Sequence, residues 1–159
     1  RTIISLLLVV MLCMSLAIGS MVTNIVYVHS VMEVDADGQL GKMTFARLLK
    51  NKAAMIVFIG FFALVPFAML VLGIMMGWWS AWYLMTLLTL PMSIFLIHST
   101  RLFAYGLPRE DKPRWWMGPM GDWDNYVKAG IDWFLFRWLL ARNICTFFCL
   151  IVIIVTLIV

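Results

Sequence analysis

Four long apolar stretches, separated by two polar segments and one short turn, make up most of this chain. A helix needs about 20 apolar residues to cross a hydrocarbon core of ~30 Å. The pattern therefore predicts an all-α fold, a polytopic transmembrane bundle of about four spans. Pro66 and Pro91 fall inside the second and third spans, where we expect kinks, because neighbouring helices can satisfy the freed carbonyls. The predicted spans cover about residues 3–28, 53–76, 79–97 and 138–159.

The composition supports a membrane environment and argues against a soluble domain. Hydrophobic residues make up 64% of the 159 positions and charged residues only 13%. A soluble chain of this size cannot hide so much apolar surface in one core. The net charge of +4 is modest, and no basic and aromatic run lies on a polar scaffold that could follow a phosphate backbone. We therefore interpret residues 1–159 as a single transmembrane domain that has the lipid bilayer, and no nucleic acid, as a partner.

The distribution of basic residues predicts the orientation of the spans. Lysine and arginine gather in the polar segments 29–52 and 98–130, whereas the turn 76–79 carries none. Loops rich in these residues near membrane spans face the cytoplasm. We therefore predict that loops 29–52 and 98–130 are cytoplasmic and that the turn and the C-terminus face outside. The stretch 131–137 is expected to be a partly polar turn before the last span.

A cluster of three acids follows the predicted first span directly. If the helix continues into the cluster, Glu33 and Asp37 are four residues apart and share one face, whereas Asp35 points elsewhere. Such oxygen ligands suit Mg²⁺, which often binds one or two carboxylates together with substrate phosphates. Lys42 and Arg47 follow and could meet a phosphate. The alternative is a solvated acidic turn that these basic residues balance, although charge at a membrane boundary is often functional.

The segment from Glu33 to Thr44 resembles the second aspartate-rich motif of the UbiA superfamily of intramembrane aromatic prenyltransferases. That motif usually reads D-x-x-D-x-E-x-D-x-x-x-G-K-x-T. Its middle and last aspartates fall on Glu33 and Asp37, and its adjacent acid falls on Asp35. One departure is Ser30, which stands where many members have the first aspartate. The G-K-x-T ending falls on Gly41, Lys42 and Thr44.

The resemblance implies a fold and a reaction. Members of the family form a nine-helix bundle whose second motif follows the sixth helix, so this chain resembles the C-terminal portion. The implied reaction is Mg²⁺-dependent transfer of a polyprenyl chain from polyprenyl diphosphate to an aromatic acceptor. Glu33 and Asp37 would hold the metal, and Lys42 and Asp35 would bind the diphosphate. The family's first motif, N-D-x-x-D-x-x-x-D, has no match here. We therefore expect a fragment that is inactive alone and whose partner is the missing N-terminal half of the same protein.

Two arginines and the acceptor leave alternatives open. Arg137 either extends to the lipid headgroups or helps to bind the diphosphate, and Arg101 could approach the diphosphate from the inner mouth. The residue at Ser30 is also not an aspartate in the menaquinone branch of the family, which favours 1,4-dihydroxy-2-naphthoate as acceptor and a bacterial inner (plasma) membrane. The rival hypothesis is a non-enzymatic membrane subunit or transporter element whose acidic cluster binds a cation or docks a partner.

Overall fold

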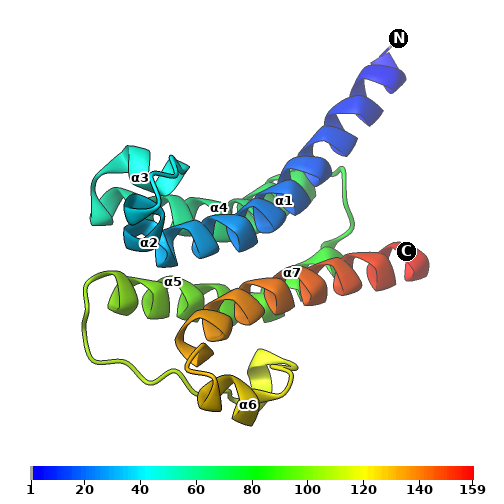
Figure 1. The fold of residues 1–159 in the computed structure, drawn as a ribbon. Helices are drawn as coiled ribbons and strands as arrows, with labels where there is room; N and C mark the ends of the chain where they lie inside the picture. The colour runs from blue at the N-terminus through cyan, green and yellow to red at the C-terminus, as the bar shows by residue number, and fades with distance from the viewer. Residues whose placement is uncertain (1) are drawn as a thin grey trace.

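The computed structural model describes residues 2–159, which contain helices and no strand (Figure 1). Three long α-helices and a shorter helix that a 3-10 segment extends make up the bundle, and short helices occupy the polar segments. The elements in chain order are α1 (Thr2–Met32), α2 (Val34–Gln39), α3 (Phe45–Leu49), α4 (Lys52–Met75), the 3-10 helix η1 (Ala81–Thr89), α5 (Leu90–Ala104), the 3-10 turn η2 (Trp115–Met117), α6 (Trp123–Lys128) and α7 (Asp132–Ile158).

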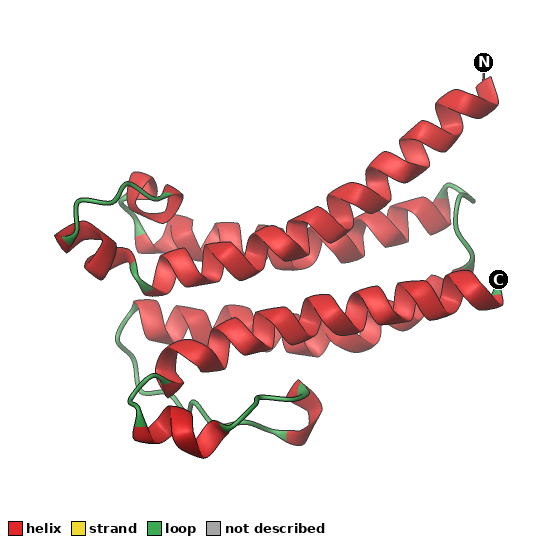
Figure 2. Ribbon diagram, turned by 45° about the vertical axis from the view of Figure 1, so that its right-hand side comes forward, coloured by secondary structure: helices red, strands yellow, loops and turns green. Residues whose placement is uncertain are grey.

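The long helices pack as two pairs, α1 with α4 and α5 with α7, and the pairs face each other (Figure 2). Fully buried side chains between them form the core, among them Ile59, Leu96, Phe136 and Phe148. The rings of Phe67 and Phe148 meet edge to face at 5.7 Å. In lipid this contact is stabilised by close packing rather than by removal of apolar surface from water.

Four helical segments are long and apolar enough to cross a membrane, which confirms the predicted number of spans. They are Ile3–Met32, Lys52–Met75, Ala81–Ala104 and Asp132–Ile158. Three boundaries differ from the predicted ones. The first helix runs four residues past residue 28, and the third continues to Ala104 rather than ending near residue 97. The last begins at Asp132, so the stretch 132–137 is helix and not a turn.

The two prolines have different structural settings. Helix α4 continues through Pro66, which is buried against the other helices. Pro91 lies in the first turn of α5, at its junction with a preceding 3-10 helix, and the first turn of an α-helix is where proline is best tolerated. The 3-10 helix η1 precedes it, and the Thr86 and Thr89 hydroxyls donate hydrogen bonds to carbonyls three residues back. The predicted third span is therefore a 3-10 segment that joins an α-helix at Leu90.

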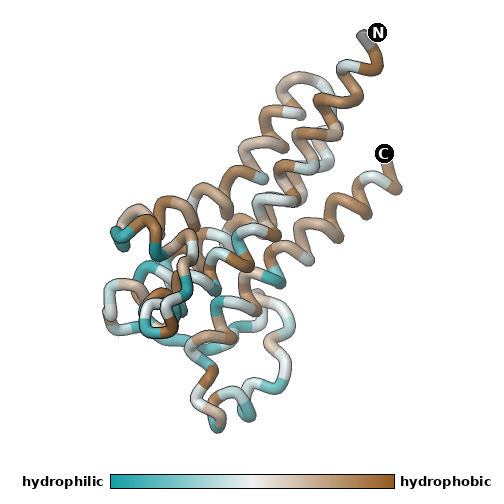
Figure 3. Tube along the Cα trace, turned by 45° about the horizontal axis from the view of Figure 1, so that its top comes forward, coloured by the Kyte–Doolittle hydropathy of each residue, from teal (hydrophilic) through white to brown (hydrophobic). Residues whose placement is uncertain are grey.

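The polar residues gather at one end of the bundle (Figure 3). Both segments that the sequence predicts to be cytoplasmic begin there, whereas the short turn after α4 lies at the opposite end (Figure 1). Helix α1 is the least buried of the four spans and shows a long apolar surface. The two polar segments therefore lie at the same end of the bundle and the turn at the other, as the four-span prediction requires.

Part of the segment 98–130 packs beside α7 instead of lying only over the end of the bundle. Met117 is fully buried, and Asn143 donates hydrogen bonds from Nδ2 to the carbonyls of Met117 and Pro119, at 2.8 and 2.9 Å. Arg142 also donates to the Pro119 carbonyl, at 2.9 Å. These bonds satisfy irregular backbone next to a membrane-spanning helix, where unpaired carbonyls are costly.

Candidate functional site

A tight turn after α2 brings the predicted acidic and basic residues together. Gly41 has φ 69°, and the Lys42 N–H bonds the Asp37 carbonyl while the Gly41 N–H bonds the Gly38 carbonyl. This pair of bonds is the Schellman pattern, in which glycine takes the left-handed conformation just after a helix. The chain therefore reverses, and Lys42 Nζ lies 3.9 Å from Asp37 Oδ1.

Arg47 fixes this turn from the side of α3. Its Nη1 donates hydrogen bonds to the carbonyls of Asp37, at 3.3 Å, and of Lys42. Both carbonyls belong to the segment that carries the acidic cluster. A charged donor shared between two carbonyls holds their relative position more firmly than a neutral donor does. Arg47 therefore has a structural role in the turn.

Glu33, Asp37 and Lys42 line one cavity of about 690 Å³, which we call the acidic cavity. Glu33 occupies the junction between α1 and α2, and the Asp37 N–H bonds the Glu33 carbonyl at 2.8 Å, so the helical spacing is kept across the junction. The shared face expected from the i, i+4 spacing is therefore present. The remaining walls are mostly hydroxyl-bearing or apolar: Thr23, Val26, Tyr27, His29, Ser30, Thr44, Phe45 and Phe62.

Several polar groups of the acidic cavity lack strong partners. The Asp37 side chain is only 8% exposed, and among residues 2–159 its one ion-pair contact is the 3.9 Å approach of Lys42. The hydroxyls of Ser30 and Thr44 are buried and find no hydrogen-bond partner within the described range 2–159. Glu33 is more exposed and contacts His29 Nε2 at 2.9 Å. A buried carboxylate and unpaired hydroxyls are costly unless another group binds them, so this end of the cavity favours a cationic or hydrogen-bonding ligand.

The donor set suits Mg²⁺ only in combination with further oxygen ligands. Within the part of the chain that the structure describes, no group of three or more His, Cys, Asp or Glu residues is placed to hold a metal. Glu33 and Asp37 supply two carboxylates, and Mg²⁺ is commonly bound by one or two carboxylates, water and substrate phosphates. The residues present therefore fit a Mg²⁺ ion that arrives with a phosphorylated substrate.

Asp35, Arg101 and Arg137, the other residues expected near a diphosphate, lie outside the acidic cavity. Asp35 lines a separate cavity on the other side of α2. Arg101 is exposed on α5. Asp35 lies on the face of α2 away from Glu33 and Asp37, and Arg101 belongs to a different helix. Of the four predicted diphosphate-binding residues, only Lys42 shares the cavity with the predicted metal ligands.

Arg137 is buried in an ion pair away from the acidic cavity. Its side chain is fully buried, and its Nη1 and Nη2 donate to the Asp111 carboxylate at 3.1 and 2.7 Å. It also donates to the carbonyls of Ser99, at 3.3 Å, and Trp133, at 2.6 Å, and its guanidinium lies 4.9 Å from the Phe103 ring centroid. Arg137 therefore ties the loop after α5 to α7, and neither reaches lipid headgroups nor lines the acidic cavity.

Comparisons with protein-family models, with curated proteins and with solved structures find no match to this chain. A functional interpretation therefore depends on the chemistry of the acidic cavity and on the motif. Sequence reasoning missed two contributors to the site. His29 could have been found, because it lies four residues before Glu33 on the same helical face. The partnerless hydroxyl of Thr44 could not, since only the folded turn removes its partners.

Proposed function

We propose that this chain is the C-terminal helical portion of a Mg²⁺-dependent intramembrane prenyltransferase. The reaction is transfer of a polyprenyl chain from polyprenyl diphosphate to an aromatic acceptor. The single observation that supports it most is the composition of the acidic cavity, in which two carboxylates and a lysine share one space with apolar side chains. A polyprenyl diphosphate has the matching distribution, with an anionic head on an apolar chain.

Each group at the polar end of the acidic cavity has a role in this proposal. Glu33 and Asp37 hold the metal, which supplies Lewis-acid stabilisation of the diphosphate leaving group when bound. Lys42 donates to a diphosphate oxygen from beside Asp37. The unpartnered hydroxyls of Ser30 and Thr44 are free to donate to the same head group. Together these donors align the head and offset the charge of the leaving group.

The apolar side of the acidic cavity holds the first isoprene units. The rings of Phe45 and Phe62 both pack against Tyr27, at 5.7 and 5.6 Å between centroids. Tyr27 is held by its hydroxyl, which donates to the Met55 carbonyl at 3.3 Å. A fixed aromatic wall excludes water from an allylic carbon that reacts with an electron-rich ring. It also favours cationic character that develops at that carbon, through the faces of the rings.

The proposal includes a second half of the protein. The extensive apolar surface of α1 is assigned to helices that carry the first aspartate-rich motif, which completes the metal site. The menaquinone branch of the family also lacks an aspartate at the position of Ser30, so the proposed acceptor is 1,4-dihydroxy-2-naphthoate. The proposed location is a bacterial inner membrane with the acidic cavity facing the cytoplasm. The chain alone is proposed to be inactive.

The test compares two aspartates of the same short helix. In membranes that contain the native protein, incorporation of labelled polyprenyl diphosphate into a prenylated aromatic product should require Mg²⁺ and stop with EDTA. Asp37→Asn should reduce this transfer by about 100-fold or more, in the range of losing a group that stabilises charge in a transition state. Asp35→Asn is the matched control and should keep most activity, since Asp35 lies outside the acidic cavity.

Two results would contradict the proposal. Transfer that survives Asp37→Asn unchanged would remove Asp37 from the metal site. Mg²⁺ binding by the native protein with no transfer to any aromatic acceptor tested would favour the rival hypothesis of a cation-binding membrane subunit.

A further inference from the structure

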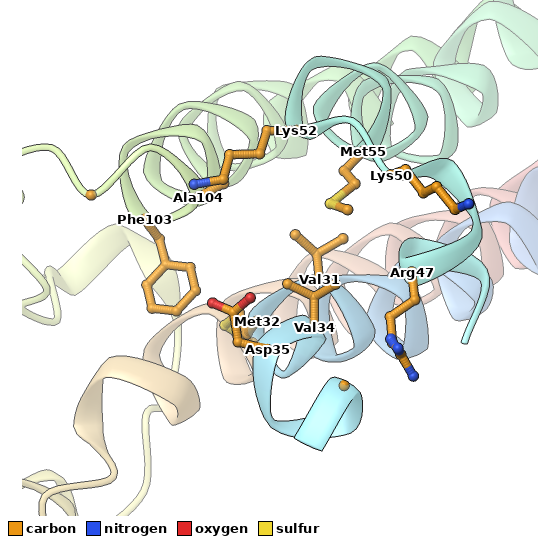
Figure 4. Close-up of a pocket in the computed structure, with 12 residues that line it drawn as sticks. Val31, Met32, Val34, Asp35, Arg47, Lys50, Lys52, Met55, Phe103 and Ala104 are labelled. Carbon is orange, nitrogen blue, oxygen red and sulfur yellow. The ribbon is translucent and has the colours of Figure 1, made fainter. Parts of the chain in front are cut away.

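A second cavity, of about 580 Å³, lies on the opposite side of α2 from the acidic cavity. We call it the basic cavity. Figure 4 shows Lys52 and Phe103 at one side of it, Lys50 and Arg47 at the other, and Asp35 between them. The cavity lies where α3, the start of α4 and the end of α5 meet the junction of α1 and α2. It is therefore at the boundary of three membrane spans.

The charge of the basic cavity is mostly unneutralised. Three cations and one carboxylate line it, which leaves an excess of two positive charges. Among residues 2–159, neither Lys50 nor Lys52 has a carboxylate within 4 Å, and Asp35 forms no ion pair. Arg47 uses only Nη1 for its bonds to the turn, so Nε and Nη2 are not bonded to the described residues. The Nζ atoms of the two lysines and Nε and Nη2 of Arg47 are thus available to an anion.

Backbone conformation at Lys50 supports a binding role. Lys50 ends α3 with φ 49°, in the left-handed region where glycine is the usual residue. A side chain there is unfavourable, and such outliers are found at binding sites, where function requires the side chain. If the position served only to end the helix, glycine or asparagine would be the better residue, so the lysine side chain is expected to have a further role. Helix α4 begins two residues later, with Lys52 at its first position.

The rest of the lining is apolar. Val31, Val34, Met55 and Phe103 contribute side chains to the cavity, and Phe103 belongs to the last turns of α5. Cations at the end of a span, above apolar side chains, match the profile of an amphiphile at the membrane surface. Each lysine or arginine near an anionic bilayer surface adds favourable attraction to its phosphates. A small soluble anion would need no apolar lining.

We propose that the basic cavity binds the head group of an anionic membrane phospholipid, attracted by the combined positive charge of Lys52 on one side of the cavity and of Lys50 and Arg47 on the other (Figure 4). This site is independent of the acidic cavity and of the proposed transfer reaction. It uses no metal, because the cations on the protein neutralise the phosphate directly. The acyl chains pass over Val31 and Phe103 toward the hydrocarbon core. A bound lipid would also brace α2 from the side opposite to Asp37, because Arg47 contacts the turn and lines the cavity.

Native mass spectrometry of the purified chain in detergent, titrated with phosphatidylglycerol or with phosphatidylcholine, tests the proposal. We expect phosphatidylglycerol to bind at least tenfold more tightly than phosphatidylcholine. The variant Lys50→Gln/Lys52→Gln should weaken phosphatidylglycerol binding by roughly 20- to 30-fold, from a factor of about 5 for each lysine. The variant Lys50→Arg/Lys52→Arg should restore most of the affinity.

A matched control removes the same charge elsewhere. Lys112→Gln/Lys128→Gln also loses two lysines of the same polar end, but neither lines the basic cavity, so its phosphatidylglycerol affinity should stay within a factor of about 2 of the wild type, within the usual spread for surface changes. Equal losses in the two double variants would overturn the site, because the attraction would then come from net charge. Displacement of phosphatidylglycerol by an equimolar amount of inorganic phosphate would overturn the lipid assignment, because the ligand would then be a free anion.

Discussion

The buried ion pair between Arg137 and Asp111 makes an asymmetric prediction for stability. Asp111→Ala leaves a fully buried guanidinium whose remaining hydrogen-bond partners, among the residues that the structure describes, are the carbonyls of Ser99 and Trp133. Removing one partner of a buried pair costs about 3–5 kcal/mol. Arg137→Met leaves Asp111 with Arg109, whose Nε lies 2.9 Å away. The lost charge-assisted hydrogen bonds then cost about 1.5–3 kcal/mol. Asp111→Ala should therefore be the more destabilising change.

The free energy of unfolding can be measured by titration of the chain from mild detergent into sodium dodecyl sulfate. The eight tryptophans report loss of packing by fluorescence, and circular dichroism reports loss of helix. In the double variant the two costs should not add, because the buried charge and its partner are both gone. Glu110→Ala is the control, since Glu110 is 65% exposed and its ion pairs at 3.8 and 3.9 Å lie on the surface; it should cost no more than about 0.5 kcal/mol.

Two outcomes would refute this reasoning. If Arg137→Met lowered the free energy of unfolding as much as Asp111→Ala or more, the guanidinium left by Asp111→Ala would have to be solvated rather than buried. Additive costs in the double variant would mean that the two groups do not depend on each other in the folded chain.

Three further predictions concern the turn after α2, the metal site and the topology of the spans. Gly41→Ala should lower the free energy of unfolding by about 1–2 kcal/mol, in the same dodecyl sulfate titration, because φ is 69° there although space for the methyl group is open; Gly41→Asn should cost less. Glu33→Gln should raise the Mg²⁺ concentration for half-maximal transfer far more than Glu33→Asp, and an unchanged Mg²⁺ requirement in Glu33→Gln would exclude it as a ligand. Cysteines in place of Lys50 and Lys112 should react with a membrane-impermeant reagent from one side and a cysteine at Gly77 from the other; reaction of all three from one side would refute the four-span topology.

The spacing of apolar and charged residues was enough to predict the spans and one face of the site. Four stretches of membrane-crossing length gave four helical segments, because length and apolarity alone decide that outcome. The i, i+4 spacing placed Glu33 and Asp37 in one cavity and Asp35 in another, because the helical pattern continues past Met32. These features are local, so neighbouring residues determine them.

Features that depend on distant residues could not be predicted. Arg137 near the start of a span suggested a headgroup or diphosphate contact, but its partner Asp111 is 26 residues away in a loop without periodicity. The start of α7 at Asp132 was missed for the same reason. The ion pair with Asp111 allows Arg137 to be buried in a helix, and nothing near Arg137 in the sequence indicates that pair. The basic cavity is lined from five helical segments and the loops beside them, and no sequence pattern around Lys50 or Lys52 indicates that Phe103 lines the same cavity.

The pairing of Arg137 with a residue that precedes α7 has a consequence for biosynthesis. Asp111 leaves the ribosome before Arg137, so the carboxylate is already present when the last span enters the bilayer. An unpaired arginine at the middle of a span costs about 2.5–3.5 kcal/mol during insertion by the translocon, and the cost is smaller for Arg137, which lies roughly 8 Å along its helix. Partitioning of the last span with the Arg137 charge paired to Asp111 lowers that cost and closes the loop in the same step. Insertion efficiency of α7 should therefore depend on the loop that is synthesised before it.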